Sequence, residues 1–219
     1  MLRLALICAL LAGPAAAGAW PRETGSAFVS GAFRFSTPRD TLGRGDIATY
    51  SSLYLEYGLA PRLTAGLDTG RAISGKDKTV VFLRWPLGRP EARNRLALEL
   101  GAGQIDAAGV IRPGLSWGRG LSVGDAGGWM AADALAEIRT DGRGADFKLD
   151  LTLGLTHESG RHNILQLQTG RQRGDDPFAR LEASVVLPAR RGLSLEMGLI
   201  AGMVNDNSLG LKLGFWREF

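Results

Sequence analysis

Apolar and polar residues alternate along most of this chain, and this period of two constrains the fold more than any other feature. The clearest example is residues 146–157, where every second residue is Phe or Leu and those between are Lys, Asp, Thr or Gly. Successive side chains of a β-strand point to opposite faces of the sheet, so such a segment has one apolar and one polar face. The pattern predicts strands.

Twelve alternating segments follow one another at a spacing of roughly sixteen residues, which suits long hairpin strands. We expect strands at 25–36, 48–59, 63–73, 79–87, 95–106, 110–118, 129–139, 146–157, 162–171, 178–187, 193–203 and 208–219. Pro113 lies inside the sixth segment, where its missing N–H interrupts strand pairing. Residues 118–128 have the composition of a loop. These two features leave a ten-strand arrangement as the alternative.

The first 19 residues have the pattern of a secretory signal peptide. A basic residue, Arg3, precedes an apolar run at 4–12, and small residues follow. The run is too short to span a bilayer as a helix. Cleavage after Ala17 or Ala19 satisfies the small-x-small rule. We favour cleavage after Ala19, which leaves residues 20–219 as a single domain.

Composition narrows the remaining classes. Cys8 is the only cysteine and lies in the predicted signal peptide, so the mature chain has no disulfide and no cysteine metal ligand. The net charge of +4 at pH 7 includes Arg3, and no long basic run indicates a nucleic-acid partner. The 31 glycines and the lack of long apolar runs after the signal argue against helical membrane spans.

The last segment, SLGLKLGFWREF, alternates as well and stops at Phe219, the final residue. This ending resembles the assembly signal of bacterial outer-membrane β-barrel proteins, with Lys212, Gly214 and Phe219 at its polar, glycine and terminal aromatic positions. Arg217 departs from the pattern, which usually has an apolar or aromatic residue there. The resemblance implies a porin-like barrel whose two ends both lie in the periplasm.

We therefore expect an all-β protein, an antiparallel transmembrane β-barrel of twelve strands in the cell outer membrane. A soluble β-sandwich or lipocalin-like barrel, with the apolar face inward, is the alternative. The resemblance implies outer-membrane lipid and the barrel-assembly machinery as partners. Lipopolysaccharide is a further candidate partner, through Arg39 and Arg44 in the first extracellular loop.

Charged residues recur on the polar face of nearly every predicted strand, which would line the barrel lumen. The expected lumen residues are Arg34, Glu56, Asp68, Arg84, Glu99, Arg112, Asp133, Glu137, Lys148, Asp150, Arg180, Glu182, Glu196 and Lys212. Six are basic and eight are acidic. They either pair with each other inside the barrel or line an aqueous path that selects solutes, and both can hold in one lumen.

Aromatic residues on the apolar face, near strand ends, are expected to form girdles at the two membrane interfaces. The periplasmic girdle would contain Tyr57, Trp85, Trp117 and Phe219, and the outer rim Phe35 and Phe147.

The sequence supplies no catalytic set. His157 and His162 flank a turn that contains Ser159, but turn composition explains the serine without chemistry, and no third metal ligand is apparent. We expect no cofactor, no metal and no enzymatic activity. The predicted function is a small channel for passive passage of small solutes. A structural or envelope-organising barrel with a closed lumen is the alternative, and an outer-membrane enzyme comes third.

Overall fold

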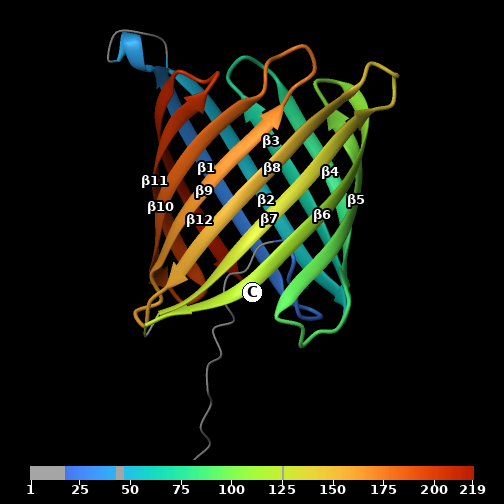
Figure 1. Ribbon diagram of the computed structural model, residues 1–219, viewed down its shortest axis with the longest axis vertical. Coiled ribbons are helices and arrows are strands. Elements are labelled where there is room, and N and C mark those ends of the chain that lie inside the picture. The colour runs from blue at the N-terminus through green and yellow to red at the C-terminus, as the bar shows by residue number, and fades with distance from the viewer. Residues whose placement is uncertain (1–17, 43–46, 125) are drawn as a thin grey trace, which may run out of the picture.

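Twelve antiparallel strands close into one barrel (Figure 1). The computed structural model describes residues 18–42, 47–124 and 126–219. The strands are β1 (Ala27–Pro38), β2 (Ala48–Ala60), β3 (Leu63–Ala72), β4 (Asp77–Leu87), β5 (Asn94–Ile105), β6 (Ala108–Val123), β7 (Ala126–Arg139), β8 (Ala145–Thr156), β9 (His162–Arg171), β10 (Phe178–Arg190), β11 (Leu193–Val204) and β12 (Ser208–Glu218). The twelve-strand prediction is confirmed.

Each strand pairs with its neighbours in the sequence, and a short 3-10 helix, η1 (Arg39–Thr41), follows β1. Among the described residues, no helix is long and apolar enough to cross a membrane. Residues 1–17 and Arg44 lie outside the described ranges, so the signal peptide and the role of Arg44 stay predictions.

The first and last strands close the barrel. β1 pairs with β12 without a break from Phe28–Glu218 to Pro38–Ser208. Beyond this ladder, the N–H of Phe219 donates to the carbonyl of Ala27 at 2.9 Å. The hydrocarbon core of a bilayer offers no water to hydrogen-bond an open strand edge, so only a closed sheet can span it. The terminal strand is therefore required for the wall itself.

The wall is apolar outside and polar inside. On β8, Leu149, Leu151 and Leu153 are 39–41% exposed, whereas Arg112 and Glu56 on other strands are only 1–2% exposed. A soluble barrel has the opposite arrangement, with apolar side chains enclosed. The soluble alternative is therefore wrong, and the fold is that of a transmembrane β-barrel.

Residues 118–128 were predicted to form a loop, but most of them extend β6 and β7. β6 continues to Val123, β7 begins at Ala126, and Gly120 pairs with Trp129 between them. The glycine-rich sequence is unfavourable for an isolated strand. Pairing between β6 and β7, at the end of a closed sheet, decides the conformation instead.

Pro113 disturbs β6 only locally. The register between β6 and β7 passes from Ile111 directly to Gly114, so Pro113 has no partner on that side. On the other side it still pairs with Leu100 of β5. A residue without an N–H can lack one ladder contact and remain in a strand when the flanking pairs hold it.

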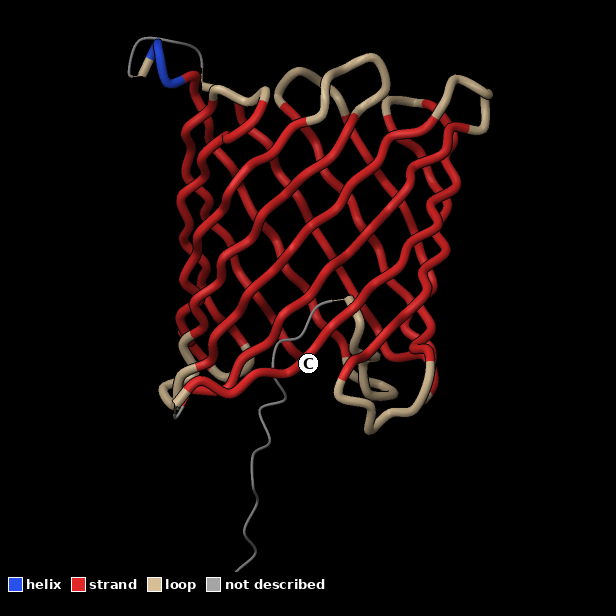
Figure 2. Tube along the Cα trace, in the orientation of Figure 1, coloured by secondary structure: helices blue, strands red, loops and turns tan. Residues whose placement is uncertain are grey.

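The C-terminus lies at the lower end of the barrel in Figures 1 and 2, and the N-terminal stretch before β1 lies near that same end. The connections at the opposite end include residues 73–76, 140–144 and 172–177. These are short, and the loops drawn in tan in Figure 2 lie at the rims. The N-terminal stretch that precedes β1 is the exception, because it turns into the barrel.

We expect the outward and inward faces of β8 to respond differently to a new charge. Leu151→Lys should destabilise the inserted protein by about 2–4 kcal/mol if the residue lies near the midplane, because the ammonium would face lipid. Thr152→Lys, the control, places the same charge in the polar lumen. Folding yield into lipid vesicles measures the difference, and equal yields would contradict the orientation of β8.

Candidate functional site

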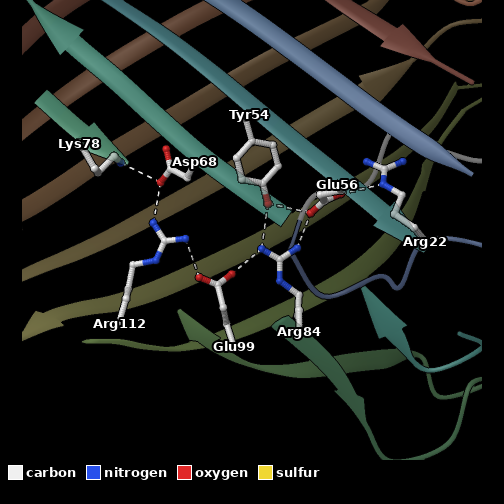
Figure 3. A network of polar contacts seen from close by, with 8 residues as sticks. All are labelled: Arg22, Tyr54, Glu56, Asp68, Lys78, Arg84, Glu99 and Arg112. Carbon is white, nitrogen blue, oxygen red and sulfur yellow. Dashed lines mark hydrogen bonds and ion pairs between the residues drawn. The ribbon is translucent and has the colours of Figure 1, made fainter. Parts of the chain in front are cut away.

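An ion-pair network lines the lumen along β2 to β6 (Figure 3). Arg84 of β4 donates to Glu56 of β2 and, at 2.7 Å, to Glu99 of β5. Arg112 of β6 forms an ion pair with Glu99 at 2.9 Å and donates a hydrogen bond to Asp68 of β3 at 2.6 Å. Cations and anions therefore alternate along one chain of contacts, which draws its members from five neighbouring strands. We call this cluster the β2–β6 network.

Three residues outside the predicted set complete this network. Lys78 donates to Asp68 at 2.7 Å, and Arg22 donates to Glu56 at 2.7 Å. The hydroxyl of Tyr54 donates to Glu56 at 2.7 Å. The period of two could have identified Tyr54 and Lys78, which lie on the inward face of β2 and β4. Arg22 precedes the first strand, so no periodicity pointed to it.

Phe82 supports the two central guanidinium groups. The Arg84 and Arg112 carbons Cζ lie 5.0 and 5.3 Å from the centroid of its ring, within the range of cation–π contacts. The ring lies over Gly66, where a Cβ atom would come within 2.1 Å of it. Glycine at 66 therefore makes the room that the ring occupies.

A second network, the β10–β12 network, lies on another part of the wall. Lys212 of β12 donates to Glu182 of β10 at 2.5 Å and to Glu196 of β11 at 2.7 Å. Arg34 of β1 donates to Glu182 at 3.1 Å. The indole N–H of Trp216 donates to Glu196 at 3.0 Å. Two cations thus neutralise two nearly enclosed carboxylates.

Several of these pairs join strands that are not neighbours. Arg34 and Glu182 connect β1 to β10 across β11 and β12, and Arg112 and Asp68 connect β6 to β3 across β4 and β5. A buried charge that lost its partner would cost several kcal/mol. The pairs therefore brace the wall and occupy lumen space at the same time.

The wall formed by β7 and β8 differs. Asp133 and Asp150 face each other in register, and Glu137 and Lys148 lie on the same inward face. None of these four makes a salt bridge with another described residue. Three predicted carboxylates and one predicted cation thus remain outside both networks.

Uncharged polar groups continue this wall onto β9. The amide of Gln168 donates to the side-chain oxygen of Gln166 at 2.8 Å, and Gln166 donates to Thr152 of β8 at 3.4 Å. Amide groups offer donors and acceptors together. We call the inward faces of β7, β8 and β9 the open polar wall.

Arg180, the last predicted lumen residue, lies at the barrel end opposite the termini. It donates to Asp206 in the β11–β12 turn at 2.7 Å. Burial alone would raise the pKa of the Asp206 carboxyl, but hydrogen bonds from Ser208 and Arg180 outweigh it and lower that pKa. Sequence analysis also missed Arg139 and Asp146, which approach to 3.6 Å at the same end.

The six residues of the predicted aromatic girdles have outward parity, but Trp117 lies six residues before the end of β6, because that strand continues to Val123. Five of them are 37–69% exposed: Phe35, Tyr57, Trp85, Phe147 and Phe219. Trp117, the sixth, is half-buried. The guanidinium of Arg217 lies 5.1 Å from the Phe219 ring centroid. Gly214 lies where a Cβ atom would come within 2.7 Å of the Gly31 carbonyl across the closure. The role of these residues in assembly stays a prediction.

The two histidines flank the turn between β8 and β9 and make local polar and aromatic contacts. His162 contacts the Thr156 hydroxyl at 2.9 Å, and its ring stacks on Trp216 at 5.8 Å. His157 contacts the amide of Asn163 at 2.8 Å. Within the described ranges, no group of three or more His, Cys, Asp or Glu residues is arranged to hold a metal ion.

Comparison with known proteins supports the fold. No model of a protein family matches the chain, and no curated protein matches it. Among solved structures, the KdgM porin has a TM-score of 0.62 at 9% identity, with 87% of this chain and 99% of that chain covered. The NanC porin has a TM-score of 0.59 at 9% identity, covering 87% and 98%.

An outer-membrane channel from Pseudomonas putida F1 has a TM-score of 0.57 at 12% identity, covering 93% of this chain and 99% of that one. These three proteins are similar in length and architecture to this chain. Because their sequences differ so widely from it, the likeness shows a common fold: the chain has the fold of outer-membrane porins.

Removing the central cation should expose the energetic weight of the β2–β6 network. Arg84→Leu leaves Glu56 and Glu99 buried without their shared partner, and we expect a loss of about 3–5 kcal/mol in unfolding free energy. In the control, Arg143→Leu removes an exposed loop pair with Asp141 and should cost about 0–1 kcal/mol. Urea unfolding in detergent measures both, and similar losses would contradict a bracing role.

Proposed function

We propose that this protein is a narrow outer-membrane channel for passive passage of small solutes, with a preference for cations. Its porin fold, its apolar outer surface and its polar lumen support this function. Charged side chains arranged around the inside of a pore commonly select solutes by the sign of their charge and by their size. Outer-membrane lipid would contact the exposed leucines, and the barrel-assembly machinery would insert the chain through its terminal strand.

The observation that carries the proposal is the open polar wall. Most lumen charges neutralise each other within the two networks, so they contribute little net field. On β7 and β8, Asp133, Glu137 and Asp150 stand against Lys148 alone. An aqueous path along this wall would therefore carry a negative potential, which favours cations over anions.

The same geometry limits the size of the solute. Twelve strands enclose far less space than the sixteen to eighteen of general porins. The cross-lumen pairs and the N-terminal stretch occupy part of that space. We infer that only small solutes pass. Passive passage of a solute involves no chemical step, and we propose no enzymatic activity.

A polyanionic solute does not suit this lumen. One structure of the KdgM porin is a complex with disordered oligogalacturonate, a polymer of carboxylated sugars. In this chain, Arg34, Arg84, Arg112 and Lys212 already bind carboxylates of the wall. The groups left outside the networks are mainly acidic and would repel such a polymer.

The second candidate function is a structural or envelope-organising barrel with a closed lumen. The pairs between β1 and β10 and between β3 and β6 favour it, because each reaches over two intervening strands through the interior and holds separate parts of the wall together. The two candidates differ in one measurable property, the passage of ions.

Purified protein in planar bilayers should give a small, cation-selective conductance. The double variant Glu137→Gln/Asp150→Asn should shift the reversal potential in a salt gradient toward zero, since it removes two lumen charges and keeps their size. Glu158→Gln, in an exposed turn, is the control and should leave the potential unchanged. A large or anion-selective conductance would refute the proposal, and absence of conductance would establish the closed barrel.

A further inference from the structure

The stretch that precedes β1 runs inside the barrel. The N–H of Gly25 donates to the Gly58 carbonyl at 2.9 Å, and the N–H of Gly58 donates to the Ser26 carbonyl at 3.0 Å. A Cβ atom at Gly58 would lie 2.0 Å from the carbonyl oxygen of Glu23. Glycine at 58 is therefore what lets the chain pass close to β2 as it turns inward, seen as the tan segment within the barrel outline in Figure 2.

Arg22 anchors this stretch to the wall. Its backbone N–H donates to the Thr64 hydroxyl at 3.0 Å, and its guanidinium donates to Glu56 at 2.7 Å. The same guanidinium lies 4.5 Å from the centroid of the Phe28 ring. Glu56 is 2% exposed, so the contact takes place deep within the wall's inner surface. The anchor belongs to β2 and β3.

From Arg22 the chain crosses toward the opposite side. Ala19 is completely enclosed, and the ring of Trp20 lies over Gly118 of β6, where a Cβ atom would come within 2.2 Å of it. At Gly18, a Cβ atom would lie 1.9 Å from an Asp133 carboxylate oxygen. Residues 18–26, which we call the lumen segment, thus reach from β2 and β3 to β6 and β7.

Asp133, which Gly18 approaches, forms no ion pair with another described residue. Ser116 lies opposite it on β6, and Asp150 lies opposite it on β8. One oxygen of Asp150 is buried without a hydrogen-bond partner among the described residues. Two facing carboxylates in an enclosed site repel each other, and a nearby positive charge would stabilise both.

We propose that the Asp133–Asp150 pair binds the α-ammonium group of the mature protein, and that the mature protein begins at Gly18. The Cβ position of Gly18 lies 1.9 Å from an Asp133 oxygen, so the Gly18 Cα atom lies beside that carboxylate, and the nitrogen is one bond from this Cα atom. A chain beginning at Trp20 would lack Gly18 and leave Asp133 without this contact. The leader is therefore removed after Ala17 rather than after Ala19.

The step that creates this group is peptide hydrolysis by a leader peptidase. One water adds across the Ala17–Gly18 bond, which breaks; Ala17 gains a carboxylate, and Gly18 keeps the amine, which takes up a proton. The new ammonium then supplies a cation at the centre of the open polar wall. The three carboxylates Asp133, Glu137 and Asp150 then face two cations, this ammonium and Lys148, so the wall keeps a small negative excess. The lumen segment would stay in the barrel, held at one end by Arg22 and at the other by Asp133.

The first test is the intact mass of the protein purified from membranes. A mass that begins at Gly18 agrees with the proposal, and one that begins at Trp20 overturns it. This readout does not depend on conductance, so it separates this proposal from the proposed function.

The second test is the rate at which a water-soluble acylating reagent modifies the α-amine, followed by peptide mapping. Asp133→Asn should raise this rate at least about tenfold, the factor that corresponds to about 1.4 kcal/mol of docking free energy. Asp175→Asn, in an exposed loop, is the control. Circular dichroism verifies that both variants fold, and equal rates in the wild type and Asp133→Asn would overturn the docking.

Discussion

Closure of the backbone hydrogen-bond ladder is the constraint on which the rest of this structure depends. A sheet in lipid cannot leave an edge unpaired, because each unsatisfied N–H or carbonyl there costs several kcal/mol. The pairing of β1 with β12 therefore fixes which residues face outward on all strands. Once Leu211 and Leu213 face lipid, Lys212 between them must face the lumen. A requirement of the backbone thus brings charged side chains into an enclosed interior.

Those enclosed charges create the second level of organisation. Arg84 lies between Glu56 and Glu99, and Lys212 lies between Glu182 and Glu196, so each cation serves two carboxylates. Desolvation of such groups is costly, and pairing offsets that cost without giving the barrel large net stability. The consequence is specificity of shape: the pairs fix which strands approach each other across the lumen. Pairing stops along the part of β7 and β8 that carries Asp133, Glu137, Lys148 and Asp150. The interior is left there with the acidic surface on which the proposed function rests.

The strands of the wall could be predicted from the sequence because the alternation of inward and outward side chains is visible within each strand. Residues 146–157 were placed within one residue of β8, and the inward and outward sides followed from parity alone. The sequence predicted the partners of lumen charges poorly, because contacts such as Arg34–Glu182 depend on curvature and on strands far apart in the chain. The end of β6 was also predicted wrongly, since Gly118 pairs with both β5 and β7, and Gly120 beyond it is held in the strand by its pairing with β7. Arg22 has no periodic context and could be found only in the folded barrel.

The high glycine content, which argued only against helices at first, has a more specific meaning in the closed barrel. Four aromatic rings lie over inward-facing glycines. The ring–glycine pairs are Tyr50 and Gly70, Phe82 and Gly66, Trp129 and Gly154, and Trp20 and Gly118. In each case a Cβ atom would come within 1.9–2.3 Å of the ring or its hydroxyl. Glycine at these positions therefore lets a ring lie close to the backbone of the wall, which packs the inner surface. A Cβ atom there would push the ring away from the backbone, into the limited interior that twelve strands enclose.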